Sequence, residues 1–297
     1  MNPLRVGTRG SDLALIQTRG VCQQLQTRNP SLVIEEVIIK THGDVSTGQL
    51  FSDGWPAGGF VGAIERALID RRVDFAVHSY KDLPIDATPG LTIAAVLVRE
   101  VAHDVLVTRE PVALDRLPHG IRIGTSSPRR AAQMRRLAGV AIVPIRGNVP
   151  TRLAKIDARE VDAVVLAAAG LKRLGIDPPH RIDLPLEWFP PAPGQGSLAL
   201  QAREDDERMV ERLAVLDDAA TRRAVDTERA FVQAIGGGCH TAVGTIATVR
   251  DGRITLYGQL FLKDGERPFE SVLSGRDPKS IGKRMAQHFK DEVEDAP

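Results

Sequence analysis

Short apolar segments alternate with amphipathic helical patterns through the first two thirds of this chain of 297 residues. Strands separated by helices are typical of parallel sheets joined by crossover helices, so the alternation predicts an α/β fold. The expected strands are residues 4–6, 33–39, 75–78, 92–96, 121–124, 142–145 and 163–166. The expected helices in this part are residues 13–27, 61–69, 129–137 and 151–158.

The pattern changes after Asp205, where helical stretches are followed by alternating apolar and polar residues. Such an order predicts a small α+β domain at the end of the chain. The expected helices here are residues 207–216, 219–235 and 278–293, and the expected strands are residues 243–249 and 254–262.

A proline-rich connection divides the α/β part. Six prolines fall between Pro178 and Pro193, and a strand-like segment at 197–200 follows, which suggests that the chain re-enters the first sheet there. A chain of this length also exceeds one average domain. The expected domains are an α/β domain of residues 1–97 and 197–215, an arginine-rich α/β domain of residues 98–196, and an α+β domain of residues 216–297.

Composition excludes several classes of protein. Hydrophobic residues at 42% and charged residues at 26% are ordinary globular values. The longest nearly unbroken apolar run, 163–171, is half of what a membrane-spanning helix requires, and the first ten residues lack the apolar core of a signal peptide. We therefore expect a cytoplasmic protein without a membrane partner. Two cysteines, Cys22 and Cys239, are too few for a disulfide framework or a four-cysteine zinc site, and no metal is expected.

The net charge of +1 hides a strongly basic segment. Residues 122–159 hold nine arginines and lysines and a single acidic residue, Asp157. Arginines delivered to the ends of neighbouring strands would repel one another without a polyanion. A nucleic acid is disfavoured, because the chain is nearly neutral and only 4% aromatic, which leaves little to stack on bases. The segment is better suited to a small polycarboxylate.

The segment 75–82 places polar residues just beyond the carboxyl end of an expected buried strand, where open α/β sheets form ligand crevices. Asp82 is its candidate for chemistry. A helix cap or a partner for Lys81 is the alternative, and the segment alone favours that alternative.

Two further segments repeat this design. In 124–130 a strand ends in small hydroxyl residues and a helix begins at Pro128, so backbone N–H groups would face an anion. Simple N-capping by Ser127 is the alternative, although a cap explains neither Arg129 nor Arg130. The segment 145–152 again supplies two arginines before a helix.

Cys239 follows three glycines that would expose its sulfur on a flexible turn. A buried, inert thiol is the usual fate of a lone cysteine, and a thiol available for covalent attachment is the sharper hypothesis. Cys22 lies in an amphipathic helix and is expected in the core. The long glycine-rich loop 41–59 is a candidate lid, because loops of such length often cover active sites.

These segments, in this order, resemble the porphobilinogen deaminase family along nearly the whole chain. The residues that carry the resemblance include Thr8-Arg9-Gly-Ser11, the run 166–175 and Pro193-Gly-Gln-Gly196. The resemblance implies two α/β domains built like a type II periplasmic binding protein, followed by a small α+β C-terminal domain. It also implies a transferase of tetrapyrrole and heme biosynthesis, hydroxymethylbilane synthase, which condenses four porphobilinogen molecules head to tail and releases ammonia.

The resemblance further assigns roles to residues. Cys239 would hold a dipyrromethane cofactor through a thioether, and Asp82 would be the catalytic carboxylate, buried near the pyrrole N–H groups. Each pyrrole carries acetate and propionate groups, which would account for the arginines. The cofactor would contact Ser79, Lys81, Ser127, Arg129 and Arg130. The substrate and growing chain would contact Arg9, Ser11, Gln17, Phe60, Arg146, Arg152 and Arg173. Family members are usually monomers.

The candidate lid departs from the family pattern. Lysines common in the family are replaced by Asp53, Ala57 and Gly62. An aspartate there would repel substrate carboxylates. Two hypotheses follow: an active deaminase whose lid works differently, and a catalytically weak paralogue that binds a pyrrole or another polycarboxylate.

Overall fold

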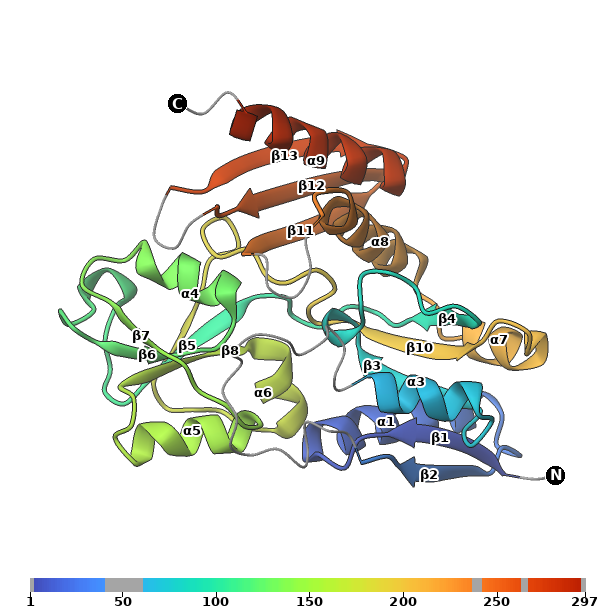
Figure 1. The fold of residues 1–297 in the computed structure, drawn as a ribbon. Coiled ribbons are helices and arrows are strands. Elements are labelled where there is room, and N and C mark those ends of the chain that lie inside the picture. Colours follow the sequence, from blue (N-terminus) through green and yellow to red (C-terminus); the bar gives the residue numbers. More distant parts are fainter. Residues whose placement is uncertain (1–2, 41–60, 237–241, 263–266, 295–297) are drawn as a thin grey trace. The chain divides into compact units, whose positions relative to one another are not determined.

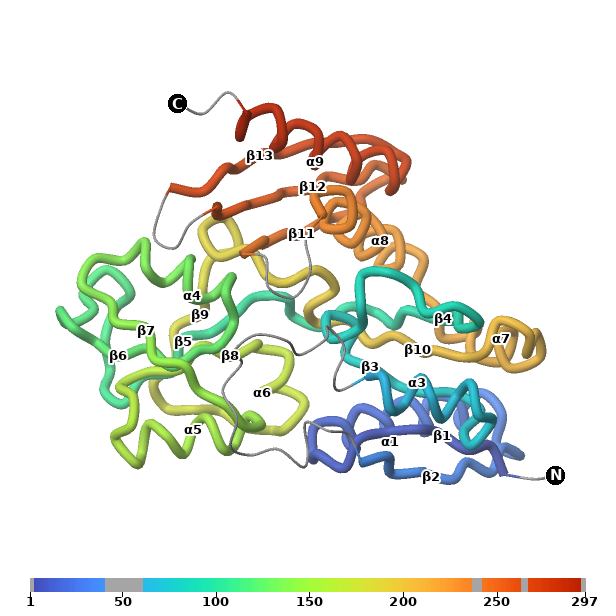
Figure 2. Tube along the Cα trace, viewed as in Figure 1, coloured from blue at the N-terminus to red at the C-terminus, as the bar shows by residue number. Residues whose placement is uncertain are grey.

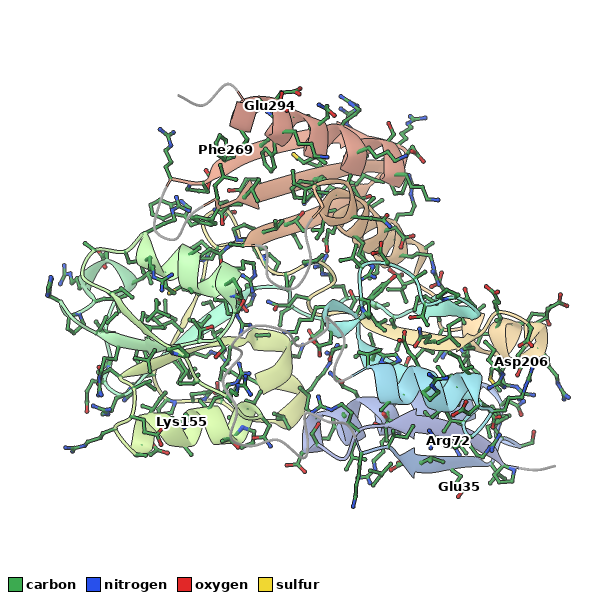
Figure 3. All side chains as sticks on the ribbon, in the orientation of Figure 1. Glu35, Arg72, Lys155, Asp206, Phe269 and Glu294 are labelled. Atoms are coloured by element: carbon green, nitrogen blue, oxygen red, sulfur yellow. The ribbon has the colours of Figure 1, made fainter. Side chains whose placement is uncertain are left out.

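The computed structural model describes residues 3–40, 61–236, 242–262 and 267–294 (Figure 1). The chain forms two compact units, Met1–Arg99 with Ser197–Arg222, and Glu100–Gly196 with Arg223–Pro297. Exposed charged side chains such as Glu35 and Arg72 project from the first unit (Figure 3).

The first unit is built on a five-stranded sheet in the order β2-β1-β3-β10-β4. Strands β1, β2 and β3 are parallel, and β10 runs antiparallel between β3 and β4. The strands are β1 (Leu4–Thr8), β2 (Ile34–Ile38), β3 (Phe75–Ser79), β4 (Leu91–Val96) and β10 (Leu198–Arg203). The helices beside it are α1 (Asp12–Arg28), α3 (Gly62–Ile69) and α7 (Glu207–Ala214).

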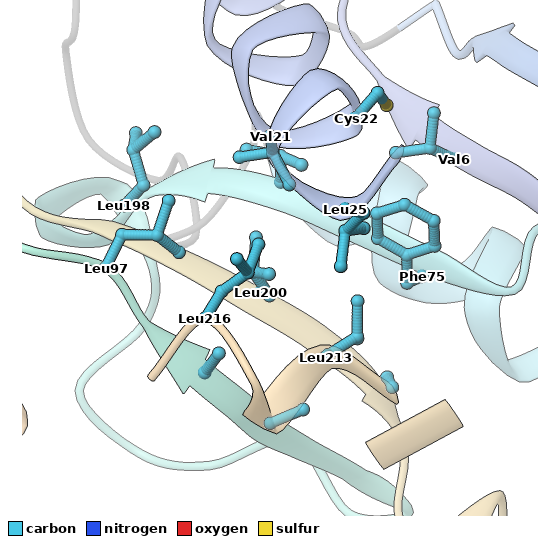
Figure 4. Close-up of a cluster of buried hydrophobic side chains, with 14 of the residues drawn as sticks. Val6, Val21, Cys22, Leu25, Phe75, Leu97, Leu198, Leu200, Leu213 and Leu216 are labelled. Atoms are coloured by element: carbon cyan, nitrogen blue, oxygen red, sulfur yellow. The ribbon is translucent and has the colours of Figure 1, made fainter. Parts of the chain in front are cut away.

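Apolar side chains cover both faces of this sheet. On one face, Phe75 and Leu200 pack with Leu25 of α1 and Leu213 of α7 (Figure 4). On the other face, α3 contributes a second cluster that includes Ile64. Burial on both faces explains why the strands appear in the sequence as near-continuous apolar runs.

The second unit contains a five-stranded sheet with the order β7-β6-β8-β5-β9. Strands β6, β7 and β8 are parallel, and β5 lies antiparallel between β8 and β9. The strands are β5 (Asp104–Thr108), β6 (Arg122–Gly124), β7 (Ala141–Val143), β8 (Ala163–Ala167) and β9 (Arg181–Asp183). The helices are α4 (Pro128–Arg135), α5 (Val149–Asp157) and α6 (Ala168–Leu174). The plan matches that of the first sheet, with one antiparallel strand inserted next to the last strand.

The rest of the second unit is a three-stranded antiparallel sheet with two helices. Phe231 and Phe289 meet edge to face, with ring centroids 5.4 Å apart. This sheet is tied to the proline-rich connection, because Thr245 N donates to Pro191 O at 2.8 Å. The elements are β11 (Val243–Arg250), β12 (Arg253–Leu260), β13 (Phe269–Gly275), α8 (Ala219–Ala234) and α9 (Pro278–Glu294) (Figure 2).

The predicted fold class is confirmed: two α/β sheets are followed by a small α+β part. The three-domain division stays a prediction. Within the described residues, no helix is long and apolar enough to cross a membrane.

Candidate active site

Strand β3 ends in a turn that presents polar side chains at the sheet edge. The 3-10 turn η1 (Tyr80–Asp82) follows the strand directly. The buried Tyr80 anchors it, since Tyr80 N donates to Ser197 O at 3.0 Å. This anchor fixes the position of Ser79, just before the turn, and of Asp82, the last residue of the turn.

A small cavity of about 70 Å³ lies at this edge of the first unit. It brings together five of the predicted site residues. These are Arg9, Ser11, Gln17, Ser79 and Asp82. Leu13, Ala14, Val61, Ile64, Val77 and His78 complete the lining.

Helix α1 supplies the second wall of this cavity. Ser11 is its N-cap and accepts a hydrogen bond from Ala14 N at 3.4 Å. Gln17, one and a half turns later, donates through Nε2 to Ser79 Oγ at 3.0 Å. The helix is therefore tied to the end of β3, which holds the two predicted polar groups in register.

Asp82 is exposed, which corrects the expectation of a buried carboxylate. The cause is its place at the end of η1, after the sheet has ended. Among the described residues its carboxylate makes no hydrogen bond or ion pair, so nothing supports the alternative of a cap or a Lys81 partner. Lys81 itself is half-buried and lies outside the cavity lining.

His78 is a cavity residue that the sequence analysis did not single out. Its side chain is 5% exposed, and burial lowers the pKa of His78 to about 4, against a smaller raising effect from Gln201. No sequence signal separates this histidine from any other polar residue at the end of a strand.

In the second unit, Arg129 and Arg130 are buried and ion-paired. Arg129 Nη2 lies 2.8 Å from Asp104 Oδ2, and Arg130 Nη2 lies 2.5 Å from Asp104 Oδ1. Arg129 also donates to Gln133 Oε1 and Pro190 O. Burial lowers the pKa of Arg129, while the Asp104 carboxylate opposes that shift. Both arginines therefore stabilise the fold, a role that the sequence analysis did not assign.

The alternative role of Ser127 is confirmed. Ser127 is the N-cap of α4, its Oγ accepts from Arg130 N at 3.5 Å, and Pro128 begins the helix. Arg130 Nε is buried and makes no hydrogen bond with any of the residues that the structure describes. The structure thus leaves an unsatisfied cationic N–H beside the cap.

The other predicted arginines lie on separate elements of the second unit. Arg146 is half-buried between β7 and α5, and Arg152 Nε, on α5, donates to Gly147 O at 2.8 Å. Arg173, on α6, donates to Gly196 O at 2.6 Å. Burial lowers the pKa of Arg173, and Glu100 opposes the shift.

The Pro193-Gly-Gln-Gly196 motif has a local explanation. Gly196 has φ +90, and a Cβ there would lie 2.4 Å from Glu100 O, so only glycine fits. Gln195, which the sequence analysis did not assign, donates to Asp104 Oδ1 at 2.9 Å and to Ala102 O at 2.7 Å. The motif therefore closes the same buried cluster that holds the two arginines.

Several predictions concern residues outside the described part of the chain. Cys239, Phe60, Asp53, Ala57 and the candidate lid belong to this group, and their roles stay predictions.

Cys22 is described and is a core residue, as predicted. Burial raises the pKa of the Cys22 thiol to about 11, so this thiol is unreactive. In the described part of the chain, no group of three or more His, Cys, Asp or Glu residues could hold a metal ion.

Known proteins resemble this chain over its full length. Residues 4–211 match the porphobilinogen deaminase dipyromethane cofactor binding domain, and residues 223–291 match the porphobilinogen deaminase C-terminal domain. A solved structure with a TM-score of 0.44 is a TRAP periplasmic solute binding protein from Desulfovibrio salexigens, 10% identical over 72% of each chain.

Curated relatives of this chain are porphobilinogen deaminases. The porphobilinogen deaminase of Roseiflexus castenholzii is 42% identical over 98% of this chain and 96% of its own length. That of Natranaerobius thermophilus is 40% identical over 96% of this chain and 94% of its own length. With both family domains matched in order and the polar edge of β3 in place, the chain belongs to the porphobilinogen deaminase family.

Proposed function

We propose that this protein is a porphobilinogen deaminase, a transferase that condenses four porphobilinogen molecules into hydroxymethylbilane and releases ammonia. The observation that carries the proposal is the unpartnered Asp82 carboxylate at a cavity lined by Arg9, Ser11, Gln17 and Ser79. In this set, the Asp82 carboxylate can stabilise a positive charge on the substrate. The Arg9 guanidinium and the serine hydroxyls can bind substrate carboxylates. No observation favours the alternative of a weak binding paralogue.

Asp82 would act on the positive charge that develops when ammonia leaves porphobilinogen. At 4 Å, opposite unit charges attract by about 1 kcal/mol in water and about 4 kcal/mol at an effective dielectric of 20. Because Asp82 is exposed, the larger value requires the bound substrate to displace water from the carboxylate. The same carboxylate can relay a proton to the leaving amine.

The residues of this chain fit a dipyrromethane cofactor. Of the two cysteines, Cys22 is buried with a raised pKa, which leaves Cys239 to hold the group through a thioether. Arg130 Nε is a buried donor without a partner, as a cofactor carboxylate would require. When bound, the group supplies the primer from which the pyrrole chain grows. Ser127, Ser79, Lys81 and Arg129 are the other proposed cofactor contacts.

The remaining arginines would bind substrate carboxylates. Arg146, Arg152 and Arg173 lie in the second unit, and the planar guanidinium group of an arginine suits the two oxygens of a carboxylate. Phe60 completes the proposed set. We also propose that the protein acts as a cytoplasmic monomer, without a nucleic-acid partner.

The intact mass of the protein tests this function. Protein purified from cells that make porphobilinogen is compared with the Cys239→Ser variant, and hydroxymethylbilane formation is assayed on both. We expect an added mass of two condensed pyrrole units in the wild type alone, together with product. An unmodified wild-type mass that persists after incubation with porphobilinogen would contradict the proposal.

A further inference from the structure

His78 has an unsatisfied nitrogen at the wall of the Asp82 cavity. The side chain is 5% exposed, it lines the cavity, and its Nε2 makes no hydrogen bond with the described residues. A buried polar atom without a partner costs about 1–3 kcal/mol. Such a cost calls for an acceptor or donor close to Nε2 within the protein.

A buried polar chain leads to His78 from α3. Strands β3 and β10 pair with Ala199 opposite His78, so Gln201 lies on the same face, diagonally across. Gln201 Nε2 donates to Glu65 Oε1 at 2.9 Å, and Thr88 Oγ1 donates to the same oxygen at 2.8 Å. Because the Glu65 carboxylate accepts, the Gln201 amide is oriented with its N–H groups toward α3.

That orientation leaves Gln201 Oε1 as an acceptor on the His78 side. Within the described part of the chain, Gln201 Oε1 is buried without a donor and His78 Nε2 is buried without a partner. Gln201 raises the pKa of His78, as an acceptor beside an imidazole N–H does, while burial lowers it more strongly, to about 4. The ring is therefore neutral at pH 7 and carries a single proton, for which the buried Gln201 Oε1 is an available acceptor.

We infer that His78 contacts the occupant of this cavity through Nδ1 as a hydrogen-bond acceptor, and that Gln201 and Glu65 are positioning residues that keep the proton on Nε2. The complementary ligand group is an N–H donor, either a pyrrole N–H or an ammonium. Porphobilinogen carries both, so the inference rests on the proposed function. The charged groups that line the same cavity, Arg9 and Asp82, have opposite signs.

Substitutions at His78 separate the two ring nitrogens. In His78→Asn, Oδ1 stands as many bonds from Cβ as Nδ1 does, whereas His78→Gln reaches the position of Nε2. We expect His78→Asn to retain kcat/KM within about threefold, and His78→Gln to lower it about tenfold, the effect of one neutral hydrogen bond. Equal kcat/KM values for the two variants would overturn the inference. Thermal unfolding of each variant controls for misfolding.

The tautomer is measured without turnover in the full-length wild-type protein. Long-range 1H–15N correlation on protein labelled with 15N-histidine identifies the protonated nitrogen, and the His78 signals are those lost in His78→Asn. We expect the proton on Nε2 between pH 8 and 5. We also expect Gln201→Leu to abolish this preference and Glu65→Gln, which retains an acceptor oxygen, to preserve it. A proton on Nδ1 would overturn the inference.

The outcomes also separate this inference from the proposed function. If the protein carries no pyrrole units and forms no product, the proposed function fails and takes the ligand contact with it, whatever the tautomer. If product forms while His78→Gln matches the wild type, only the inference fails.

Discussion

Asp82 is the residue on which the proposed chemistry depends most. Its carboxylate is exposed, has no partner among the described residues, and lies where β3 ends. A carboxylate that stabilised the fold would be paired, as Asp104 is. The carboxylate of Asp82 is therefore accessible to a ligand in the cavity.

We expect Asp82→Ala to abolish most hydroxymethylbilane formation while the cofactor stays attached. The loss of rate should lie between about fivefold and about a thousandfold, the range set by a charge interaction at high or intermediate dielectric. Product formation and intact mass are measured on the same sample. Asp86→Ala, an exposed aspartate outside the cavity lining, is the matched control. Turnover in Asp82→Ala equal to that of the wild type would remove Asp82 from the mechanism.

Asp104 illustrates the opposite kind of residue. It is fully buried and accepts from Arg129, Arg130 and Gln195. We expect Asp104→Ala to lower the free energy of unfolding by about 3–5 kcal/mol, because two buried guanidinium groups lose their counter-ion. Urea unfolding measures this loss. Asp183→Ala, at a carboxylate 57% exposed, should change it by less than about 1 kcal/mol, and an equal effect of both variants would contradict the argument.

At the scale of elements, the turn at Gly196 joins the buried Asp104 cluster to Arg173. We expect Gly196→Ala to lower the free energy of unfolding by about 2–4 kcal/mol, since its Cβ would clash with Glu100 O and its φ is +90. Gly90→Ala is the matched control, because Gly90 has φ +80 with open space around it. Chemical denaturation should show a cost of about 1 kcal/mol there. Equal losses would mean that the clash at Gly196 is relieved without strain.

The sequence predicted most strands of both α/β sheets but missed β9, which is only three residues long, and β5. That strand is completely buried yet begins with a charged residue, Asp104, whose two arginine partners are far along the chain. Helix α6 was missed because the apolar run 163–171 continues from β8 into the helix, and periodicity cannot divide so short a run. Strand β13 is half-exposed and was also missed.

The sequence predicted the site residues that belong to recognisable motifs. It missed the residues whose role comes from being buried against distant parts of the chain. Five of the predicted residues line one cavity because the ends of β1 and β3 and the start of α1 meet at one sheet edge. His78, Gln195 and Asp104 were not identified, since their importance comes from long-range partners. The buried pairing of Arg129 and Arg130 was missed for the same reason.

Over the whole molecule, the two α/β sheets share one strand order although the sequence shows no repeat. In each sheet, the antiparallel strand lies outside the stretch of sequence that holds the other four strands. Strand β10 follows the other strands of its sheet after about one hundred residues, and β5 precedes the other strands of its sheet. The first sheet therefore lacks its fourth position, between β3 and β4, until β10 is present. Such long-range pairing is expected to slow folding.

The pH dependence of stability is the prediction that belongs to the whole chain. The folded protein lowers the pKa of His78 to about 4 from an ordinary value of 6.5, so the unfolded state binds the proton first as the pH falls. Stability contributed by the neutral ring is therefore complete above about pH 6.5 and is lost progressively down to about pH 4. The loss should approach about 3 kcal/mol. Below that window, protonation of Asp162, whose pKa Arg122 lowers to about 2, adds a further loss.

Urea unfolding from pH 7.5 to 4.5 measures this dependence. In His78→Asn the free energy of unfolding should fall less steeply between pH 6.5 and 4.5 than in the wild type, because the titrating ring is gone. Identical slopes for the wild type and His78→Asn would show that the ring takes up its proton equally well in the folded protein, and with it that the buried chain from Glu65 to His78 does not hold the ring neutral.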